Sequence, residues 1–306
     1  MSKIKSLIKQ NFWGNYLISC YHIVACKVAP ALMNDEKAVK RYYKKRFGKE
    51  LDLSNPQTFA EKINWYKLNS NDPLMVQCAD KVAVRDYVKD KGYGDCLNEV
   101  YGVYDNVDDI DIDSLPKQFV IKAAHGSHMN YIVKDKDNFD WKHAKLMMKT
   151  WLHQDIYWSG REWVYKDIPK RIIVEKYLED ETGELRDFKF FCFHGHIANI
   201  EYDAGRFGET HFRNFYDNSS NLLDINDGEF YPDLSLKRVP VNNEVFTRMQ
   251  ELVACLSDSF EHARVDLYCV NNKIYFGEIT FFDGGGSTSF KPDKWNYLFS
   301  KDWALC

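Results

Sequence analysis

The fold prediction for this chain rests on ARVDLYCVNNKIYFGEITFFDGGGS, residues 263–287. Two runs of β-favouring residues, 265–270 and 273–281, lie on either side of Asn271-Asn272. Two such runs joined by a two-residue turn of this kind are typical of a β-hairpin. The sequence therefore predicts two adjacent antiparallel strands late in the chain.

Charged residues are expected to gather on one face of this hairpin, because side chains alternate between the two faces of a strand. The alternation collects Arg264, Asp266 and Tyr268 from the first strand, and Phe276, Glu278 and Thr280 from the second. Pairing across the turn then brings Asp266 near Glu278. Two such carboxylates can bind a hard cation such as Mg²⁺, which commonly partners phosphates. The alternative is a solvated hairpin face with an incidental ion pair.

The composition is that of a folded globular protein. Its 306 residues are 45% hydrophobic, which is enough for a large core and two or three lobes. The formal net charge of −4 provides no basic field, so no nucleic-acid partner is expected. The eight cysteines include no C-x-x-C pair and no zinc-finger spacing, which predicts a reducing, cytoplasmic compartment and no disulfide framework.

The N-terminal segment has two open interpretations. Lys3, Lys5 and Lys9 precede a mainly apolar run at 16–33, which a histidine and a lysine interrupt, so the run is not expected to span a bilayer. It can form a basic amphipathic helix on the inner face of a membrane. It can equally form a helix that caps the domain.

We expect four segments along the chain. They are an N-terminal helical segment over 1–36, a helical region over 37–97, a small β lobe over 98–170 and a large β lobe over 171–306. The helical region contains a capping box, Thr58-x-x-Glu61. A further helix is predicted to start at Asp72-Pro73 and to continue through Lys81 to Gly92.

The small lobe contains a candidate anion-binding turn. A short strand over 119–124, which carries Lys122, leads into the small-residue turn 125–128 and a second strand over 131–133. Backbone N–H groups of such a turn can wrap an anion, although an ordinary hairpin looks the same. A helix is predicted to follow over 140–158.

The large lobe adds further polar candidates. Strands are predicted over 171–178, 186–193 and 197–202, and a helix over 241–260. Asp187 and Lys189 share a strand face, where they can hold a ribose and a phosphate or simply pair with each other. Arg206 and Arg213 lie in a segment predicted as loop, and two arginines there can clamp a carboxylate or phosphate.

Together these pieces resemble the ATP-grasp superfamily. The resemblance lies in their order: a lysine strand before a Gly/Ser turn, a strand ending in Glu-Lys-Tyr-Leu, and a late R-x-D and E-x-T hairpin. Residues 37–298 are similar to its TupA-like branch through NPQTFAEKINWYKL, DKVAVRDYV, RIIVEKYL, LRDFKFFCFHG, RNFYD, RVDLY and IYFGEITFF. The resemblance implies an α+β ATP-grasp fold, in which a nucleotide is held between two β-sheet lobes.

The resemblance also implies residue roles. The ATP-binding residues would be Lys81, Lys122, Gly126, Ser127, His128, Glu175, Lys176, Leu178, Asp187 and Lys189, with Glu181 a rival of Asp187 for the ribose. Two Mg²⁺ ions would be held by Asp266, Glu278 and Thr280, the last standing where many superfamily members have Asn. The catalytic and substrate-end candidates are Arg264, Lys122, Arg206, Arg213 and Gly284–Ser287.

The implied activity is an ATP- and Mg²⁺-dependent carboxylate–amine ligase that works through an acyl phosphate. The TupA-like branch is associated with teichuronopeptide, capsule and other surface-polysaccharide biosynthesis. The expected substrates are therefore a carboxylate-bearing glycan precursor and a small amine or amino acid. Two alternatives stay open: a glycosyltransferase acting on the same precursor, and a non-catalytic carbohydrate-binding or scaffold protein.

Overall fold

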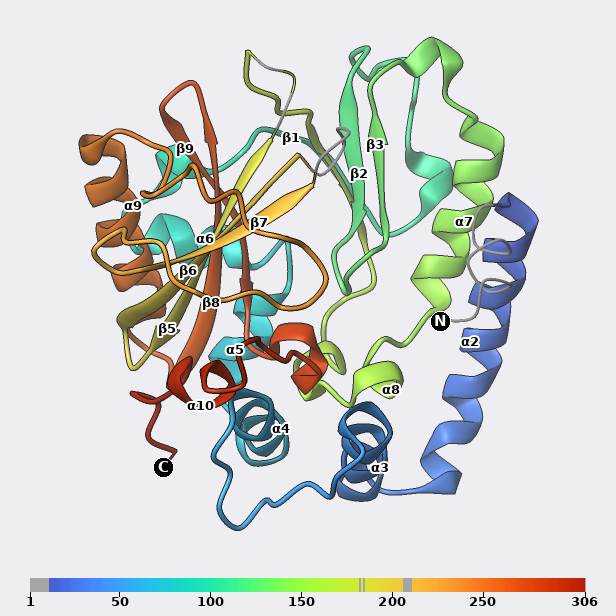
Figure 1. The fold of residues 1–306 in the computed structure, drawn as a ribbon. Helices are drawn as coiled ribbons and strands as arrows, with labels where there is room; N and C mark the ends of the chain where they lie inside the picture. Colours follow the sequence, from blue (N-terminus) through green and yellow to red (C-terminus); the bar gives the residue numbers. More distant parts are fainter. Residues whose placement is uncertain (1–10, 182, 184, 206–210, 306) are drawn as a thin grey trace. The chain divides into compact units, whose positions relative to one another are not determined.

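The computed structural model describes residues 11–181, 183, 185–205 and 211–305, and it confirms the α+β class (Figure 1). The chain divides into two compact units. Unit 1 comprises Met1–Ala38, Asp80–Val82 and Glu99–Tyr177, and unit 2 comprises Val39–Ala79, Ala83–Asn98 and Leu178–Cys306. Four predicted residues, Lys3, Lys5, Lys9 and Arg206, lie outside the described residues.

Unit 1 is built on a four-stranded antiparallel sheet. Its strand order is β1 (Val100–Tyr104), β4 (Ile172–Lys176), β2 (Phe119–Ala123), β3 (Asn130–Val133). Its helices are α2 (Phe12–Leu32), α7 (Trp141–His153) and α8 (Tyr157–Gly160), with 3₁₀ turns at Val107–Asp109, Lys136–Asn138 and Trp163–Tyr165. Apolar residues of β2 and β4 pack with Met148 and Trp151 of α7 to form the core.

Unit 2 is built on a five-stranded antiparallel sheet. Its strand order is β7 (Phe212–Asp217), β6 (His196–Ala204), β5 (Arg186–Phe193), β8 (His262–Val270), β9 (Lys273–Thr280). Its helices are α4 (Phe59–Asn69), α5 (Pro73–Ala79), α6 (Val84–Asp90), α9 (Asn243–Ser257) and α10 (Trp295–Leu298), with 3₁₀ turns η1 (Gly94–Cys96) and η5 (Asp283–Gly286). Helix α3 (Asp35–Phe47) begins in unit 1 and ends in unit 2.

One face of the unit 2 sheet is apolar. The other carries charged side chains together with Phe191 and Phe193, which pack against Phe59 of α4. Helix α9 is amphipathic and contacts β5, β6 and β8 through its apolar side, which buries Met249, Leu252 and Leu256 (Figure 1). Charged side chains of the same strands therefore fall on the opposite face, as strand alternation requires.

The predicted β8–β9 hairpin is confirmed, with one correction. Asn271 and Asn272 both have positive φ, 51° and 65°, as a two-residue type I′ turn demands. The register shifts between Asp266 and Leu267, so that Asp266 is opposite Glu278 but Leu267 is opposite Phe276. The expectation that Phe276 shares a face with Glu278 is therefore wrong, because Gly277 forms a bulge between them.

Three other predicted elements also need correction. The single helix expected from Asp72 to Gly92 is two helices, α5 and α6, because the Asp80 carboxylate accepts a hydrogen bond from the Val82 N–H, 2.9 Å, and turns the chain. The helix expected over 140–158 ends at His153 and is followed by the separate α8. Arg213 lies in strand β7 rather than in a loop.

The helix starts follow the sequence closely. The capping box of α4 is present: the Glu61 N–H donates to Thr58 Oγ1, 3.3 Å, and the Thr58 N–H donates to Glu61 Oε2, 2.9 Å. Within the described part of the chain, none of the helices has the length and hydropathy of a membrane-spanning segment.

Candidate active site

The polar face of the unit 2 sheet places charged residues of four strands in one row. Lys189 of β5 is opposite Glu201 of β6 on one side and Asp266 of β8 on the other. Asp266 is in turn opposite Glu278 of β9. Directly opposed side chains of antiparallel strands share a face, so the predicted proximity of Asp266 and Glu278 is confirmed.

Where the row reaches β8 and β9, Arg264 contacts each of the polar side chains around it. Its Nε and Nη2 each donate to the Asp266 carboxylate at 2.7 Å, in a bidentate pair. Nη2 also reaches Glu278 Oε1 at 3.3 Å and Thr280 Oγ1 at 3.2 Å, and Nη1 donates to Asp283. We call Arg264, Asp266, Glu278, Thr280 and Asp283 the Arg264 cluster.

The Arg264 cluster has more negative charge than its one guanidinium can neutralise. Burial raises the pKa of Asp266 against the pull of Arg264, and the charges of Asp187 and Glu278 raise it further. Burial would raise the pKa of Asp283 as well, but the charge and hydrogen bond of Arg264 lower it below its ordinary value. The Glu278 side chain is 36% exposed and opens the cluster to solvent.

The oxygen donors of this cluster fit Mg²⁺. Two carboxylates and the Thr280 hydroxyl are hard ligands of the kind that magnesium takes, and excess negative charge favours a cation. Among the described residues, no three His, Cys, Asp or Glu side chains already converge as a metal site. The Arg264 guanidinium lies between the carboxylates instead, so Mg²⁺ would bind at the exposed Glu278 side.

Helix α4 positions the glycine turn that follows β9. Asn64 Nδ2 donates to the Gly286 carbonyl, 2.8 Å, and Lys67 Nζ donates to the Gly285 carbonyl, 2.7 Å. Gly286 has φ +74°, and a Cβ there would lie 2.4 Å from Asn64 Nδ2, so only glycine fits. The turn thereby fixes Asp283, whose carboxylate also accepts from Thr288 Oγ1 at 3.0 Å.

A second buried charge cluster lies on β5, β6 and β7. We call it the Arg213 cluster, and its members are Lys189, Glu201, Asp203, His211, Arg213 and Asp227. Lys189 Nζ lies 2.5 Å from Glu201 and 3.1 Å from Asp203. Burial alone would lower the pKa of Lys189, but the carboxylates, Glu201 first, raise it above its ordinary value.

Arg213 is therefore surrounded by carboxylates. Its Nε lies 3.0 Å from Glu201 Oε1, its Nη2 lies 3.0 Å from Asp203 Oδ2, and its Nη1 pairs with Asp227. The structure brings Arg213 and Lys189 together through Glu201. Asp187, the predicted ribose acceptor, lies beside Lys189 at 3.9 Å, so the sequence-based pairing of these two is present.

In unit 1, the structure brings together the predicted strand lysine and the first hinge residue. Lys122 Nζ of β2 lies 2.7 Å from Glu175 Oε2 of β4. β2 and β4 are paired with Lys122 opposite Ile173, so Glu175 is the diagonal neighbour on the same face. Both side chains are largely buried, which makes this a well-shielded ion pair.

The predicted phosphate turn connects β2 to β3 and is held by Lys81. Lys81 Nζ donates to the Gly126 carbonyl, 2.8 Å, and the Lys81 N–H donates to the Ala124 carbonyl, 3.4 Å. Gly126 is buried, whereas Ser127 and His128 are exposed at the tip, where His128 has φ 58°. Their exposure leaves the tip accessible to a ligand.

The predicted adenine hinge runs from β4 into unit 2. The Lys176 N–H donates to the Glu99 carbonyl, 2.9 Å, so this N–H is already used within unit 1. Leu178 is the first residue of unit 2. Glu181, the rival ribose acceptor, lines a small cavity of unit 2 together with Asp180 and Arg186.

Sequence reasoning missed several polar residues of these clusters. Asp283 precedes three glycines and is not among the predicted site residues, although its carboxylate accepts a hydrogen bond from Arg264. Glu201 and Asp203 alternate in the stretch IEYDA, and this alternation was the signal that could have placed them on the polar face. No local pattern marks Asn64 and Lys67, because their contacts are about 220 residues away.

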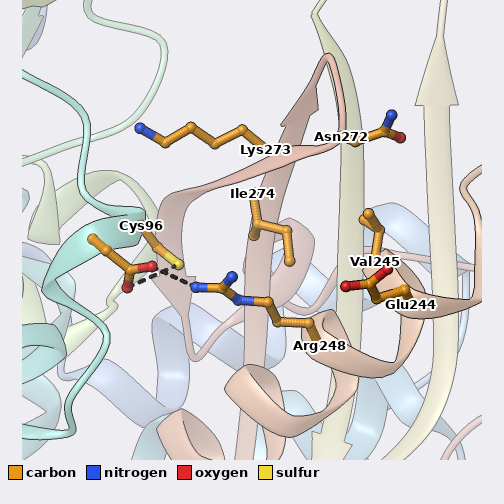
Figure 2. Close-up of a pocket in the computed structure, with 8 residues that line it drawn as sticks. Cys96, Glu244, Val245, Arg248, Asn272, Lys273 and Ile274 are labelled. Carbon is orange, nitrogen blue, oxygen red and sulfur yellow. Dashed lines mark hydrogen bonds and ion pairs between the residues drawn. The ribbon is translucent and has the colours of Figure 1, made fainter.

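A separate cavity in unit 2 contains none of the predicted site residues. It lies between η1, the first turns of α9 and the β8–β9 turn, and Glu244, Arg248 and Lys273 are among its lining residues (Figure 2). Arg248 is paired with Asp95 at its edge, so its charge is already neutralised. We assign this cavity no role.

Comparison with known proteins places the chain in a family. Three similar solved structures are D-alanine–D-alanine ligase from Bacillus anthracis complexed with ATP (TM-score 0.38, 16% identity, 67% of this chain and 54% of that chain), an ADP complex of the N5-carboxyaminoimidazole ribonucleotide synthetase PurK (0.44, 10%, 72% and 50%) and L-amino acid ligase from Bacillus licheniformis (0.44, 14%, 84% and 55%). The chain spans about half the length of these proteins. A comparison with curated proteins found no match. The family model for TupA-like ATPgrasp matches residues 61–301, and the chain therefore belongs to the TupA-like ATP-grasp family.

Proposed function

We propose that this protein is an ATP-dependent carboxylate–amine ligase. One observation carries the proposal: Asp266 and Glu278 are directly opposite each other on adjacent strands, with Arg264 between them. Membership of an ATP-grasp family supports it. With ATP as the phosphoryl donor, we propose that the reaction takes place in the cytoplasm.

Residues of both units would bind ATP. In unit 1, Lys122 would contact the α-phosphate in place of Glu175, and the exposed tip Ser127–His128 would cover the terminal phosphates through backbone N–H groups. Lys81 would fix that tip through the Gly126 carbonyl. The hinge from Glu175 to Leu178 would read the purine edge, and Asp187 would accept from the ribose.

Asp266, Glu278 and Thr280 would hold Mg²⁺, which neutralises charge on the phosphates when bound. Arg264 would contribute a fixed positive charge at the transferred phosphoryl group. Asp283 would keep Arg264 in place, because it grips Nη1 while Asp266 grips the other side of the guanidinium. The buried setting of these groups strengthens each electrostatic contact.

The proposed reaction has two steps. A substrate carboxylate oxygen attacks the γ-phosphorus of ATP, the bond from that phosphorus to the β,γ-bridging oxygen breaks, and ADP leaves. An amine then attacks the carbonyl carbon of the acyl phosphate, loses a proton, and expels inorganic phosphate as the amide forms. Exclusion of water is required, since water would hydrolyse the acyl phosphate.

We further propose a uronic-acid or peptide carboxylate of a cell-surface glycan precursor as the acid, and an amino acid or small amino alcohol as the amine. The association of the TupA-like branch with surface polysaccharides supports this choice. Arg213 and Gly284–Ser287 remain our candidates for the substrate end. Arg213 would then have to exchange one of its carboxylate partners for the substrate.

A two-part assay tests the proposal. The protein is mixed with ATP, Mg²⁺ and glucuronic acid with or without glycine or ethanolamine, and ADP is measured; glucose, which lacks the carboxylate, is the control. Hydroxylamine replaces the amine in a second series, because it converts an acyl phosphate into a detectable hydroxamate. We expect ADP with the acid and not with glucose. ADP formation that is as fast with glucose as with the acid, for every acid–amine pair, would contradict the ligase reaction.

A further inference from the structure

Helix α2 of unit 1 carries an exposed apolar stripe. We use the name α2 stripe for Trp13, Leu17, Tyr21, Val24 and Val28, whose exposed fractions run from 50% to 69%. At about 100° per residue, these five positions fall within an arc of roughly 80° on the helix. They are therefore one continuous apolar face rather than scattered surface residues.

The other side of α2 is already packed against unit 1. Phe12 and Tyr16 pack against the unit 1 core, and Ser19 Oγ lies 3.6 Å from Met147 Sδ of α7, which runs beside α2 (Figure 1). Of the stripe residues, Trp13 also contacts His143 of α7, with ring centroids 5.7 Å apart, but the packing of unit 1 leaves all five stripe residues at least half exposed. A surface helix normally carries charged residues on its outer face, and a large exposed apolar patch marks an interaction site.

The charge of the N-terminal sequence favours one partner for the stripe. The sequence contains Lys3, Lys5, Lys9 and Lys27 and neither Asp nor Glu before Asp35, although the whole chain has a formal net charge of −4. A basic sequence segment that includes an apolar helical face favours a surface of anionic lipid. Trp and Tyr are also the residues that favour the interface between lipid and water.

We propose that the α2 stripe docks the protein on an anionic membrane surface, with α2 lying in the plane of the lipid headgroups. The five side chains expose on the order of 500 Å², less than the roughly 800 Å² per partner that a stable protein interface buries. A second copy of the chain is therefore the weaker candidate. The α2 stripe contains no residue of the proposed reaction, so either proposal can fail without the other.

Vesicle sedimentation of the full chain tests this docking. The vesicles are phosphatidylcholine alone, or an equal mixture of phosphatidylcholine and phosphatidylglycerol. The test variant is Leu17→Glu/Val24→Glu. The matched control is His22→Glu/Tyr42→Glu, which adds the same charge at exposed positions away from the stripe on α2 and on α3. Circular dichroism and the Tm establish that each variant is folded.

We expect the wild-type protein to sediment with the mixed vesicles, and to do so less as salt is added. The stripe variant should bind at least about tenfold more weakly, because two apolar side chains no longer enter the lipid. The control should lose only a few-fold. Absence of wild-type binding to the mixed vesicles would overturn the proposal, as would equal binding by the stripe variant. If the wild-type protein is a dimer and the stripe variant is a monomer, the membrane proposal is overturned in favour of a second copy of the chain.

Discussion

The Arg264 and Arg213 clusters share one face of the unit 2 sheet but differ in charge balance. Arg264 is the one cation of its cluster and faces three carboxylates, Asp266, Glu278 and Asp283. In the Arg213 cluster, three carboxylates face Arg213, Lys189 and the imidazole of His211. Among their members, the Arg264 cluster has two more carboxylates than full cations, and the Arg213 cluster has one more.

The two clusters also differ in access to solvent. Glu278 has a side chain that is 36% exposed, whereas the carboxylates of Glu201, Asp203 and Asp227 are at most 11% exposed. Burying charge is costly unless each group is paired, and the Arg213 cluster meets that condition. An open cluster with excess negative charge is instead arranged to take a further cation. Burial of charge alone therefore does not locate the site, whereas an excess of carboxylates beside an exposed side chain does.

The largest expected effect is that of Asp266→Asn. It removes the carboxylate that both grips Arg264 and would hold Mg²⁺, so the rate of ADP formation should fall about a thousandfold. The measurement is ADP release with a working acid–amine pair at saturating Mg²⁺. Asp227→Asn is the matched change in the Arg213 cluster. Because it removes one partner of Arg213, our substrate-end candidate, it should change the KM for the acid and lower the Tm, but it should lower kcat no more than about threefold. Equal losses in both variants would remove the distinction between the clusters.

Glu278→Gln should have the next largest effect, about a hundredfold at low Mg²⁺, since it removes one proposed ligand. Its Tm should stay near that of the wild-type protein, because the side chain is partly exposed. Turnover as a function of Mg²⁺ concentration is the measurement, and raising Mg²⁺ should recover part of the loss. Glu244→Gln, an exposed acid at the start of α9, serves as the control. A loss that no Mg²⁺ concentration changes would argue against a ligand role.

Lys122→Met tests the unit 1 contribution and should raise the KM for ATP about tenfold, with a smaller change in kcat. The neutral side chain keeps the length of lysine but loses the charge. The variant also leaves Glu175 without this ion pair, so the Tm should fall as well. Lys122→Arg keeps the positive charge and should restore most of the Tm and the KM. If the KM for ATP is unchanged in Lys122→Met, Lys122 does not bind a phosphate of ATP.

Local sequence patterns predicted the hairpin that carries the Arg264 cluster. Alternation placed Asp266 and Glu278 on one face, and Asn271-Asn272 defined the turn. The position of Phe276 was missed, because a bulge depends on how one glycine, Gly277, is accommodated by the neighbouring strand. The β-propensity of the residues predicts that a strand forms, whereas the pairing with the neighbouring strand determines where a bulge lies.

Contacts distant in sequence could not be predicted from local patterns. The break between α5 and α6 depends on Asp80, whose carboxylate pairs with Arg171, 2.6 Å away and 91 residues later in the chain. The three partners of Arg213 come from β6 and from the loop at Asp227, so a guanidinium predicted to meet substrate lies among protein carboxylates. Periodicity indicates which face a residue occupies, but it does not indicate which neighbours neutralise its charge.

Substitution of His262 is expected to have the smallest effect on turnover and to change the acid stability of unit 2 instead. It distinguishes unfolding caused by protonation of this buried histidine from unfolding caused by protonation of either cluster. His262 is fully buried, and its Nδ1 donates to the Cys192 carbonyl at 3.0 Å. Its Nε2 has no hydrogen-bond partner within the described part of the chain. Burial lowers the pKa of His262 from 6.5 to about 4, because a proton on Nε2 would put an unpaired charge in the core.

The sign of the pH effect follows from this lowered pKa. Below pH 6.5 the unfolded chain binds a proton at this histidine, whereas the folded protein does not. The free energy of unfolding therefore decreases as the pH is lowered from 6.5 to about 4, and then levels off. The drop from this one group should be about 3 kcal/mol. His262→Gln should remove that part of the pH dependence in urea unfolding curves, and His194→Gln, at an exposed histidine, should leave it intact. An unchanged slope in His262→Gln would assign the acid sensitivity to the charge clusters instead.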